Sequence, residues 1–244
     1  MDIEATFNKL NQMKFHGFSR AYKETMESSL ATNFTADQLI AHLVDAEWDD
    51  RFNRKLNRLI SNAKFRYNAS FEQIDFTAKR NLDKNTILRL QQCDWIKKKQ
   101  NVIITGSTGV GKSYIASALG YQACLHSFKV MYCNSSKFFD KLKQDKADGS
   151  YIREIDKIQR QDLLIIDDFG LKHFDSEKRL FLLEIMEDRH DKKSTIFTSQ
   201  MPVKNWFDII GEPTIADAIL DRVTHHSHRI ELNGESLRKK SYSN

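Results

Sequence analysis

The sequence carries a phosphate-binding loop within residues 101–113, NVIITGSTGVGKS. In the spacing G-x-x-x-x-G-K-S, glycines let the backbone fold back so that its N–H groups surround phosphate oxygens at the start of a helix. Lys112 would reach the β- and γ-phosphates, and the hydroxyl of Ser113 would ligate Mg²⁺. The predicted nucleotide contacts are Gly106, Ser107, Thr108, Gly109, Val110, Gly111, Lys112, Ser113 and Tyr114.

Such a loop needs a buried strand before it and a helix after it. Residues 102–105 are a β-branched run, and Ile115, Leu119 and Ala123 have the spacing of one helix face. A glycine-rich turn with an incidental lysine is the simpler alternative. The flanking pattern favours strand, phosphate loop and helix.

A second acidic element follows an apolar run at residues 163–166. The acids Asp167 and Asp168 come at its carboxyl end, where ligands bind in open α/β sheets. We expect Asp167 to hold the Mg²⁺ shell and Asp168 to orient the attacking water, as in a Walker B element. An apolar run before an aspartate is common at strand ends, so the pairing with the phosphate loop carries this prediction.

A further strand is expected at residues 195–198, ending in Ser199 and Gln200. If this strand lies between the other two, Gln200 would stand beside the γ-phosphate. The alternative is a strand-to-loop transition that any polar residue would serve. A helix at residues 214–224, with Arg222 near its end, and a strand at residues 227–232 complete the pattern.

The alternation of strands and helices predicts an α/β fold in which a parallel sheet is sandwiched by helices. Residues 1–66 read as helical, with a capping box at Thr35 and Gln38 opening the strongest helix. We therefore expect a small all-α N-terminal domain at residues 1–68 and a nucleotide-binding core at residues 69–244.

Basic residues gather in the second half of that strongest helix. Six basic residues and no acidic residue stand between positions 51 and 71. A phosphate backbone would suit the basic face formed by Arg51, Arg54, Lys55 and Arg58. The alternative is the solvated outer face of a structural helix whose apolar side is used for packing.

A second basic helix is expected after residue 134. It carries Lys137, Lys141 and Lys143, which would form another phosphate-contacting surface or an ordinary exposed charged face. The net charge of the 244 residues is +5, which makes an anionic partner plausible without identifying it.

Other sequence features limit the kinds of site and the cellular location that we expect. The three cysteines have no C-x-x-C spacing, so neither a disulfide framework nor a zinc site is predicted. His225, His226 and His228 lack a carboxylate or thiol at a spacing that would complete a metal site, and we expect them to have rim or packing roles. No signal core or long apolar segment is evident, so we expect a cytoplasmic protein that makes no contact with a membrane.

The chain resembles the IstB-like transposition helper ATPases, compact AAA+ proteins related to the DnaC helicase loaders and the DnaA initiators. The resemblance extends over nearly the whole chain. It is carried by NVIITGSTGVGKSYIASALG, LLIIDDFG, STIFTSQMPVKNW, FEQIDFTAKRNLDKNTILRLQQCDWI and EPTIADAILDRVTHHSHRIELNGES. The last two are specific to the family, whereas the Walker motifs occur in many nucleotide hydrolases.

The resemblance implies an AAA+ core that uses ATP and Mg²⁺. Lys112, Asp167, Asp168, Gln200 and Arg222 would be its catalytic residues, with Ser113 and Asp167 at the metal, Gln200 as sensor 1 and Arg222 as the arginine finger. A finger acts on ATP bound to a neighbouring subunit, so the family role implies a homo-oligomer. Family members assemble on duplex DNA and assist a cognate transposase, and the insertion carrying Lys137, Lys141 and Lys143 would line a DNA path.

The chain departs from the family pattern at three points. Asp168 stands where many AAA+ proteins have glutamate, and Gln200 replaces a commoner asparagine. Only 22 residues follow Arg222, so we expect no AAA+ lid, and Arg238 is a candidate for the lid's sensor arginine.

Three other functions fit parts of the pattern. A helicase loader would prefer single-stranded DNA and bind a replicative helicase. A small-molecule kinase would need an acceptor pocket, which is not evident. A binding switch would hold ATP with little turnover, which the short side chain of Asp168 makes conceivable.

Overall fold

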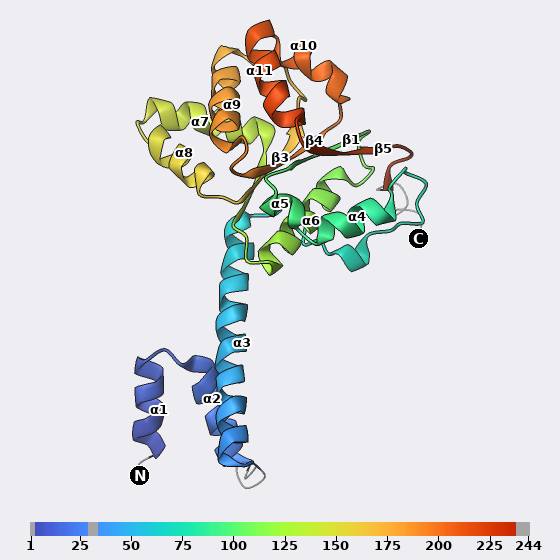
Figure 1. Cartoon of the computed structure of the whole chain (residues 1–244). Helices are drawn as coiled ribbons and strands as arrows, with labels where there is room; N and C mark the ends of the chain where they lie inside the picture. The colour runs from blue at the N-terminus through green and yellow to red at the C-terminus, as the bar shows by residue number, and fades with distance from the viewer. Residues whose placement is uncertain (1–2, 29–33, 238–244) are drawn as a thin grey trace. The chain divides into compact units, whose positions relative to one another are not determined.

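The computed structural model describes residues 3–28 and 34–237 (Figure 1). These residues divide into two compact units, residues 1–58 and 59–244, and the division falls within one long helix. The domain limits expected from the sequence, 1–68 and 69–244, stay a proposal. Among the described residues, no helix combines the length and the apolar character needed to span a membrane.

The first unit is helical. Its elements are α1 (Ile3–Gln12), α2 (His16–Glu27) and the first part of α3 (Ala36–Ala63). The predicted capping box opens α3, because the Thr35 N–H donates to Gln38 Oε1 at 2.9 Å and the Gln38 N–H donates to Thr35 Oγ1 at 3.3 Å. This reciprocal pair satisfies two N–H groups that have no partner inside the helix.

A buried carboxylate fastens α2 to α3. Glu47 of α3 is 5% exposed and accepts hydrogen bonds from the N–H groups of Gly17 (2.9 Å) and Phe18 (3.1 Å) at the start of α2. Arg51 donates to the same carboxylate at 2.5 Å. Burial by itself would raise the pKa of Glu47, but these hydrogen bonds outweigh it and lower the pKa. The carboxylate therefore stays charged at the helix start.

The apolar side of α3 is only partly used for packing. Leu43 is 4% exposed, whereas four apolar residues at four-residue spacing are exposed: Ile40, Val44, Trp48 and Phe52. The sequence-based assumption that this face is needed for packing therefore fails for Phe52 and its three neighbours along the helix.

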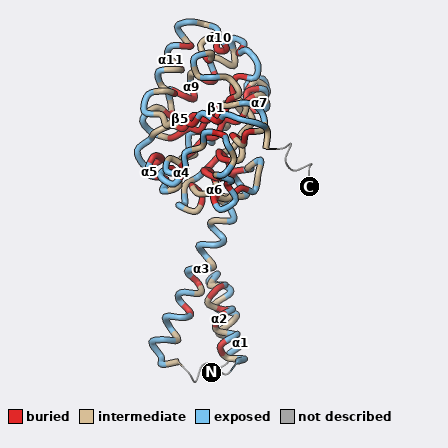
Figure 2. The backbone as a smooth tube through the Cα atoms, turned by 90° about the vertical axis from the view of Figure 1, so that its right-hand side faces the viewer, coloured by how far each residue is buried: buried red, intermediate tan, exposed pale blue. Residues whose placement is uncertain are grey.

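The second unit is built on five parallel strands (Figure 1). They are β1 (Asn101–Gly106), β2 (Val130–Asn134), β3 (Leu163–Phe169), β4 (Ser194–Ser199) and β5 (Ser227–Leu232), in the order β2-β3-β4-β1-β5. Residues 102–105 and 163–167 are buried without a break, as expected for strands covered on both faces. Figure 2 shows this concentration of buried residues at the sheet.

Helices cover both faces of the sheet (Figure 1). The helical elements of this unit, after the end of α3, are η2 (Phe71–Gln73), α4 (Lys84–Gln91), α5 (Asp94–Lys97), α6 (Lys112–Leu125), α7 (Ser135–Ala147), α8 (Tyr151–Gln159), α9 (Ser176–Arg189), η3 (Val203–Asn205), α10 (Trp206–Ile210) and α11 (Pro213–Thr224). α6 lies on one face with α4 and α5, and α7, α9 and α11 lie on the other. The predicted α/β fold is confirmed.

The core beneath α7, α9 and α11 is rich in aromatic side chains. Phe169 at the end of β3 lies 4.6 Å from Trp206 and 5.2 Å from Phe197 between ring centroids. Because Phe169 and Phe197 belong to adjacent strands, this cluster fixes the end of β3 where the two acids stand.

An arginine is buried at the opposite end of the strands. Arg189, 2% exposed, donates to the carbonyl groups of Ile158 (3.1 Å), Gln161 (3.1 Å) and Ser194 (2.5 Å). Burial lowers its pKa to about 10, so the side chain remains protonated at neutral pH. It joins the end of α8 to the start of β4.

We expect Arg189→Met to lower the free energy of unfolding by about 2–4 kcal/mol, because three buried carbonyl groups would lose their donor. Urea denaturation followed by circular dichroism measures the change. Arg160→Met, at the exposed residue that follows α8, is the matched control. It should change the free energy of unfolding by less than about 0.5 kcal/mol. Equal effects of the two substitutions would contradict the role given to Arg189.

Candidate active site

The phosphate loop joins β1 to α6, as the sequence predicts. Gly109 and Gly111 have φ values of 86° and 98°, which glycine adopts without strain. A Cβ at Gly111 would lie 2.5 Å from Arg80 Nη1, and one at Gly109 would lie 2.0 Å from Ser236 Oγ. The loop is therefore a backbone cradle that no larger residue could line at these two positions.

Lys112 begins α6 at the mouth of this loop. Its side chain is largely buried, and its Nζ donates to the carbonyl groups of Gly106 (2.7 Å) and Ser107 (2.8 Å). These two hydrogen bonds hold the ammonium group against the backbone of the phosphate loop, whose N–H groups would bind phosphate.

Ser113 and Asp167 meet next to the loop. Ser113 Oγ donates to Asp167 Oδ1 at 2.7 Å, and Thr198 Oγ1 donates to the same oxygen. Tyr132 donates to Asp167 Oδ2 at 2.5 Å. A hydroxyl and a carboxylate are hard oxygen donors of the kind Mg²⁺ prefers, so the two residues predicted at the metal fit that ion.

The backbone of β3 is distorted at Asp168. Its φ is 58°, and the pairing between β3 and β4 shifts register between Ile166 and Phe169. The Asp168 N–H donates to Thr198 Oγ1 at 3.0 Å, and Asn134 Nδ2 donates to Asp168 Oδ2 at 3.1 Å. A non-glycine residue in this conformation is strained, and the distortion turns the Asp168 side chain toward the phosphate loop.

Gln200 follows β4, which lies between β3 and β1 as its predicted role requires. Its Oε1 accepts a hydrogen bond of 2.7 Å from Thr108 Oγ1. The amide therefore reaches the phosphate loop directly.

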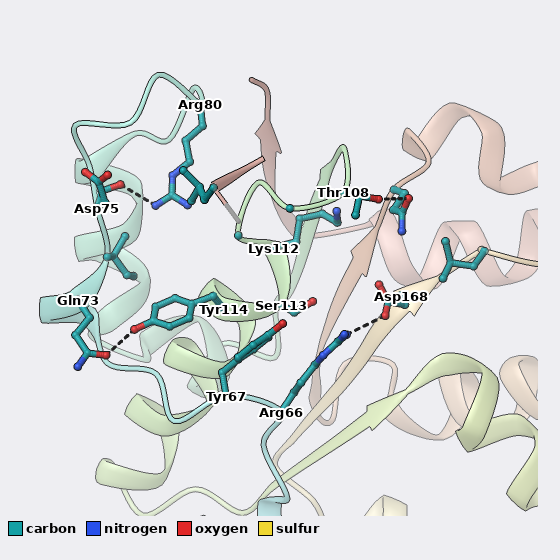
Figure 3. A pocket seen from close by; sticks show the side chains of 16 residues that line it. Arg66, Tyr67, Gln73, Asp75, Arg80, Thr108, Lys112, Ser113, Tyr114 and Asp168 are labelled. Carbon is teal, nitrogen blue, oxygen red and sulfur yellow. Dashed lines mark hydrogen bonds and ion pairs between the residues drawn. The ribbon is translucent and has the colours of Figure 1, made fainter. Parts of the chain in front are cut away.

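Arg66 is an additional cation at the site. Its Nη1 lies 3.1 Å from Asp168 Oδ2 (Figure 3) and 3.1 Å from Asp167 Oδ2. Burial would lower the pKa of Arg66, but the hydrogen bond to Asp167 and the charge interactions with Asp167, Tyr67 and Tyr132 together outweigh it and raise the pKa. The sequence analysis did not single out Arg66, which stands in an irregular segment between α3 and η2.

These groups line a cavity of about 450 Å³ that extends beyond the phosphate loop (Figure 3). Its wall includes Thr108, Gly109, Gly111, Lys112, Ser113, Tyr114, Asp168 and Gln200 from the predicted set. The far part is lined by residues that were not predicted: Tyr67, Gln73, Ile74, Asp75, Arg80, Leu171 and Leu237. Four of them lie in the FEQIDFTAKR segment. The resemblance of that segment to the family was the sequence feature from which these residues could have been found.

Two segments distant in sequence close the cavity around the loop. Arg80, 5% exposed, donates to the carbonyl groups of Val110 (3.0 Å) and Asp75 (2.7 Å). The Leu237 N–H donates to the Gly109 carbonyl at 2.9 Å, and Ser107 Oγ donates to the Gly234 carbonyl at 3.4 Å. The loop is thus supported from both sides.

Arg222 is placed far from this cavity. The Asn101 side chain donates to the Arg222 carbonyl at 3.1 Å, so Arg222 lies at the amino end of β1, whereas the phosphate loop follows its carboxyl end. Its guanidinium forms an ion pair of 3.0 Å with Glu187 and donates to the Ala218 carbonyl at 2.7 Å.

The predicted DNA-contact residues differ in their surroundings. Several are paired with acids: Arg51 with Glu47 at 2.5 Å, Arg54 with Asp50 at 2.6 Å, Lys141 with Asp145 at 2.9 Å and Lys143 with Asp175 at 2.9 Å. Lys55, Arg58 and Lys137 are exposed. The paired side chains would have to exchange an acid for a phosphate.

Two further expectations concern the last part of the chain. Arg238 lies outside the described residues. His225 and His226 stack edge to face, with 4.1 Å between ring centroids, and His228 Nε2 is 2.9 Å from Gln100 Oε1. Within residues 3–28 and 34–237, no three His, Cys, Asp or Glu side chains gather as a metal site; Mg²⁺ at Ser113 and Asp167 would need oxygens of the nucleotide as further ligands.

Known proteins match this chain in sequence and in structure. An insertion sequence ATP-binding protein of Sinorhizobium fredii, y4pL, is 41% identical over 96% of both chains. The IS1162 ATP-binding protein of Pseudomonas fluorescens is 35% identical over 83% of this chain and 88% of its own. The replication initiator DnaA of Aquifex aeolicus, solved with AMPPCP, superposes with a TM-score of 0.60 at 16% identity, over 73% of this chain and 54% of that one.

The likeness to DnaA concerns the fold alone. The sequence match is wider, since a family model described as IstB-like ATP binding protein covers residues 8–244. The family predicted from the sequence is therefore confirmed: the chain belongs to the IstB-like ATP-binding proteins, a family of AAA+ ATPases.

Proposed function

We propose that this protein is an ATP-dependent transposition helper that assembles on duplex DNA, hydrolyses ATP and assists a cognate transposase. The observation that carries the ATPase part is the contact of 2.7 Å between Ser113 and Asp167 beside the phosphate loop. The names of the relatives, which are insertion sequence ATP-binding proteins, support the link to transposition.

The triphosphate would lie in the backbone cradle with its terminal phosphate toward Asp168 and Gln200. Bound Mg²⁺ would neutralise phosphate charge at Ser113 and Asp167. Asp168 would accept a hydrogen bond from the attacking water, whose oxygen bonds to the γ-phosphorus while the bond to the bridging oxygen of ADP breaks. Lys112 would stabilise the charge that passes to the phosphate oxygens, and the water's proton would leave through Asp168 or solvent.

The nucleobase would occupy the part of the cavity lined by Tyr67, Ile74, Tyr114 and Leu237. Two tyrosine rings and two aliphatic side chains offer flat and apolar surfaces of the kind that bind a purine. Gln73, which accepts a hydrogen bond of 2.7 Å from Tyr114, holds one of these rings in place.

Arg222 would act on the nucleotide of a second subunit. β1 has six residues, so its two ends lie about 17 Å apart, and a side chain at the amino end cannot reach a phosphate bound at the carboxyl end. Its pair with Glu187 is partly exposed and contributes at most about 1 kcal/mol. An arriving phosphate can therefore displace that carboxylate.

DNA would be held through its phosphates by α3 and α7. Lys55, Arg58 and Lys137 are exposed, and Arg51, Arg54, Lys141 and Lys143 would exchange their acids for phosphates. Contacts of this kind set position rather than base sequence, so weak target preference is expected.

The central test is the ATPase rate with duplex DNA, single-stranded DNA and no DNA, at two protein concentrations. For the wild type we expect stimulation by duplex that grows with concentration, since the site is completed by a neighbour. Arg222→Ala should lower the stimulated rate at least about hundredfold, with nucleotide affinity within about twofold of wild type. Arg229→Ala, an exposed arginine on β5, is the control.

Each result has a distinct meaning. Stimulation by single strands alone would replace the transposition helper by a helicase loader. Turnover that is independent of DNA, concentration and Arg222 would leave a monomeric ATPase or a kinase.

A pair of variants separates an ATPase from a switch that only holds ATP. Lys112→Ala should abolish both nucleotide binding and assembly on DNA, because the phosphate charge loses its counter-ion. Asp168→Asn should keep assembly and lower the hydrolysis rate at least about hundredfold. Sedimentation on duplex DNA and phosphate release measure the two properties, and unchanged hydrolysis in Asp168→Asn would contradict the role of that carboxylate.

The proposed DNA surface is tested by salt dependence. The double variant Lys55→Ala, Arg58→Ala should reduce the slope of log K against log salt by about 2, because each lost phosphate contact releases one counter-ion fewer. Fluorescence anisotropy with a labelled duplex gives the slope. Lys9→Ala, Lys14→Ala, at exposed basic positions off that face, should leave it unchanged; an unchanged slope in the first variant would remove this surface.

A further inference from the structure

One nitrogen of Arg66 serves both acids of the site. Nη1 donates to Asp167 Oδ2 and to Asp168 Oδ2, each at 3.1 Å. The residue follows α3, which ends at Ala63, and its guanidinium lies 5.6 Å from the centre of the Tyr67 ring. Figure 3 shows the Arg66 side chain pointing toward Asp168, with Ser113 lining the same cavity.

The two acids depend on Arg66 to different degrees. The Asp167 carboxylate is fully buried and also accepts hydrogen bonds from Ser113, Thr198 and Tyr132. The Asp168 side chain is 20% exposed, and among the described residues its side-chain donors are Arg66 and Asn134, both at Oδ2. Release of Arg66 would therefore leave Asp167 fixed and would remove one of the two donors to Asp168, the group expected to orient water.

The ion pairs between Arg66 and the two aspartates can be exchanged for another anion. Its side chain is 41% exposed, and an ion pair with that much solvent access is weak. A terminal phosphate carries more charge than a carboxylate and accepts two parallel hydrogen bonds from a guanidinium fork. Because Arg66 and the phosphate loop line the same cavity, such a phosphate would compete directly with the aspartates.

We propose that Arg66 is the residue with which this site distinguishes ATP from ADP within one subunit. Its guanidinium binds the terminal phosphate of ATP and so releases Asp168, and it returns to the two aspartates when that phosphate is lost. The inference rests on the proposed function only in that ATP binds here, and it assigns Arg66 a role distinct from those proposed for Arg222 and Gln200.

The test compares the dissociation constants of a non-hydrolysable ATP analogue and of ADP, measured by displacement of a fluorescent nucleotide from the full chain. For Arg66→Met we expect the preference for the ATP analogue over ADP to fall about tenfold or more, as for loss of a charge-assisted hydrogen bond. The loss should persist in EDTA, because the contact is made by the arginine and not through the metal. Arg66→Lys keeps the positive charge but loses the forked guanidinium group. Its preference for the ATP analogue over ADP should lie between that of the wild type and that of Arg66→Met.

Tyr132→Phe is the matched control, since it removes a hydrogen bond to the same Asp167 oxygen and no charge. Its nucleotide preference should equal that of the wild type, and thermal melts show whether each variant folds. An unchanged preference in Arg66→Met, a loss seen only with Mg²⁺ present, or an equal loss in Tyr132→Phe would each overturn the proposal. A wild type that binds neither nucleotide would overturn the proposed function itself.

Discussion

The structure of the site depends on one buried anion, the carboxylate of Asp167. A charge without solvent access must be matched by donors, because its desolvation is costly. Its four side-chain partners come from four separate parts of the fold: Ser113 of α6, Tyr132 of β2, Thr198 of β4 and Arg66 of the segment after α3. Because several donors share this carboxylate, the anion stays paired when Arg66 leaves it, and it ties α6, β2 and β4 together at one edge of the sheet.

The parallel sheet supplies the remaining order. With β4 between β3 and β1, the carboxyl ends of three strands present Asp168, Gln200 and the phosphate loop at one edge. The same arrangement puts Arg222 at the other edge, beside the start of β1. One sheet thus separates the groups that act within a subunit from the group that would act on a neighbour.

Local patterns predicted what is local. The phosphate loop, the apolar run before Asp167 and the limits of β5 follow from residue spacing and agree with the structure. Contacts between distant segments were beyond such patterns: Arg66 reaches acids more than 100 residues away, and the donors Asn134 and Tyr132 depend on strand order. The same limit applies to Glu154 of α8, which pairs with Lys141, and to Glu177 of α9, which pairs with Lys143, because a charge count along α7 does not reveal acids on other helices.

The segment from Asn233 to Leu237 has a consequence for biosynthesis. β1 is synthesised before both of its neighbours in the sheet, β4 and β5. The loop after β1 is completed by contacts with Gly234 and Leu237. During translation, residues 107–193 must therefore be synthesised after β1 before β4 begins, and residues 107–226 before β5 begins. A nascent chain that ends before β5 lacks one wall of the cavity, so nucleotide can bind the whole cavity and stabilise the fold only after residues 227–237 have been synthesised.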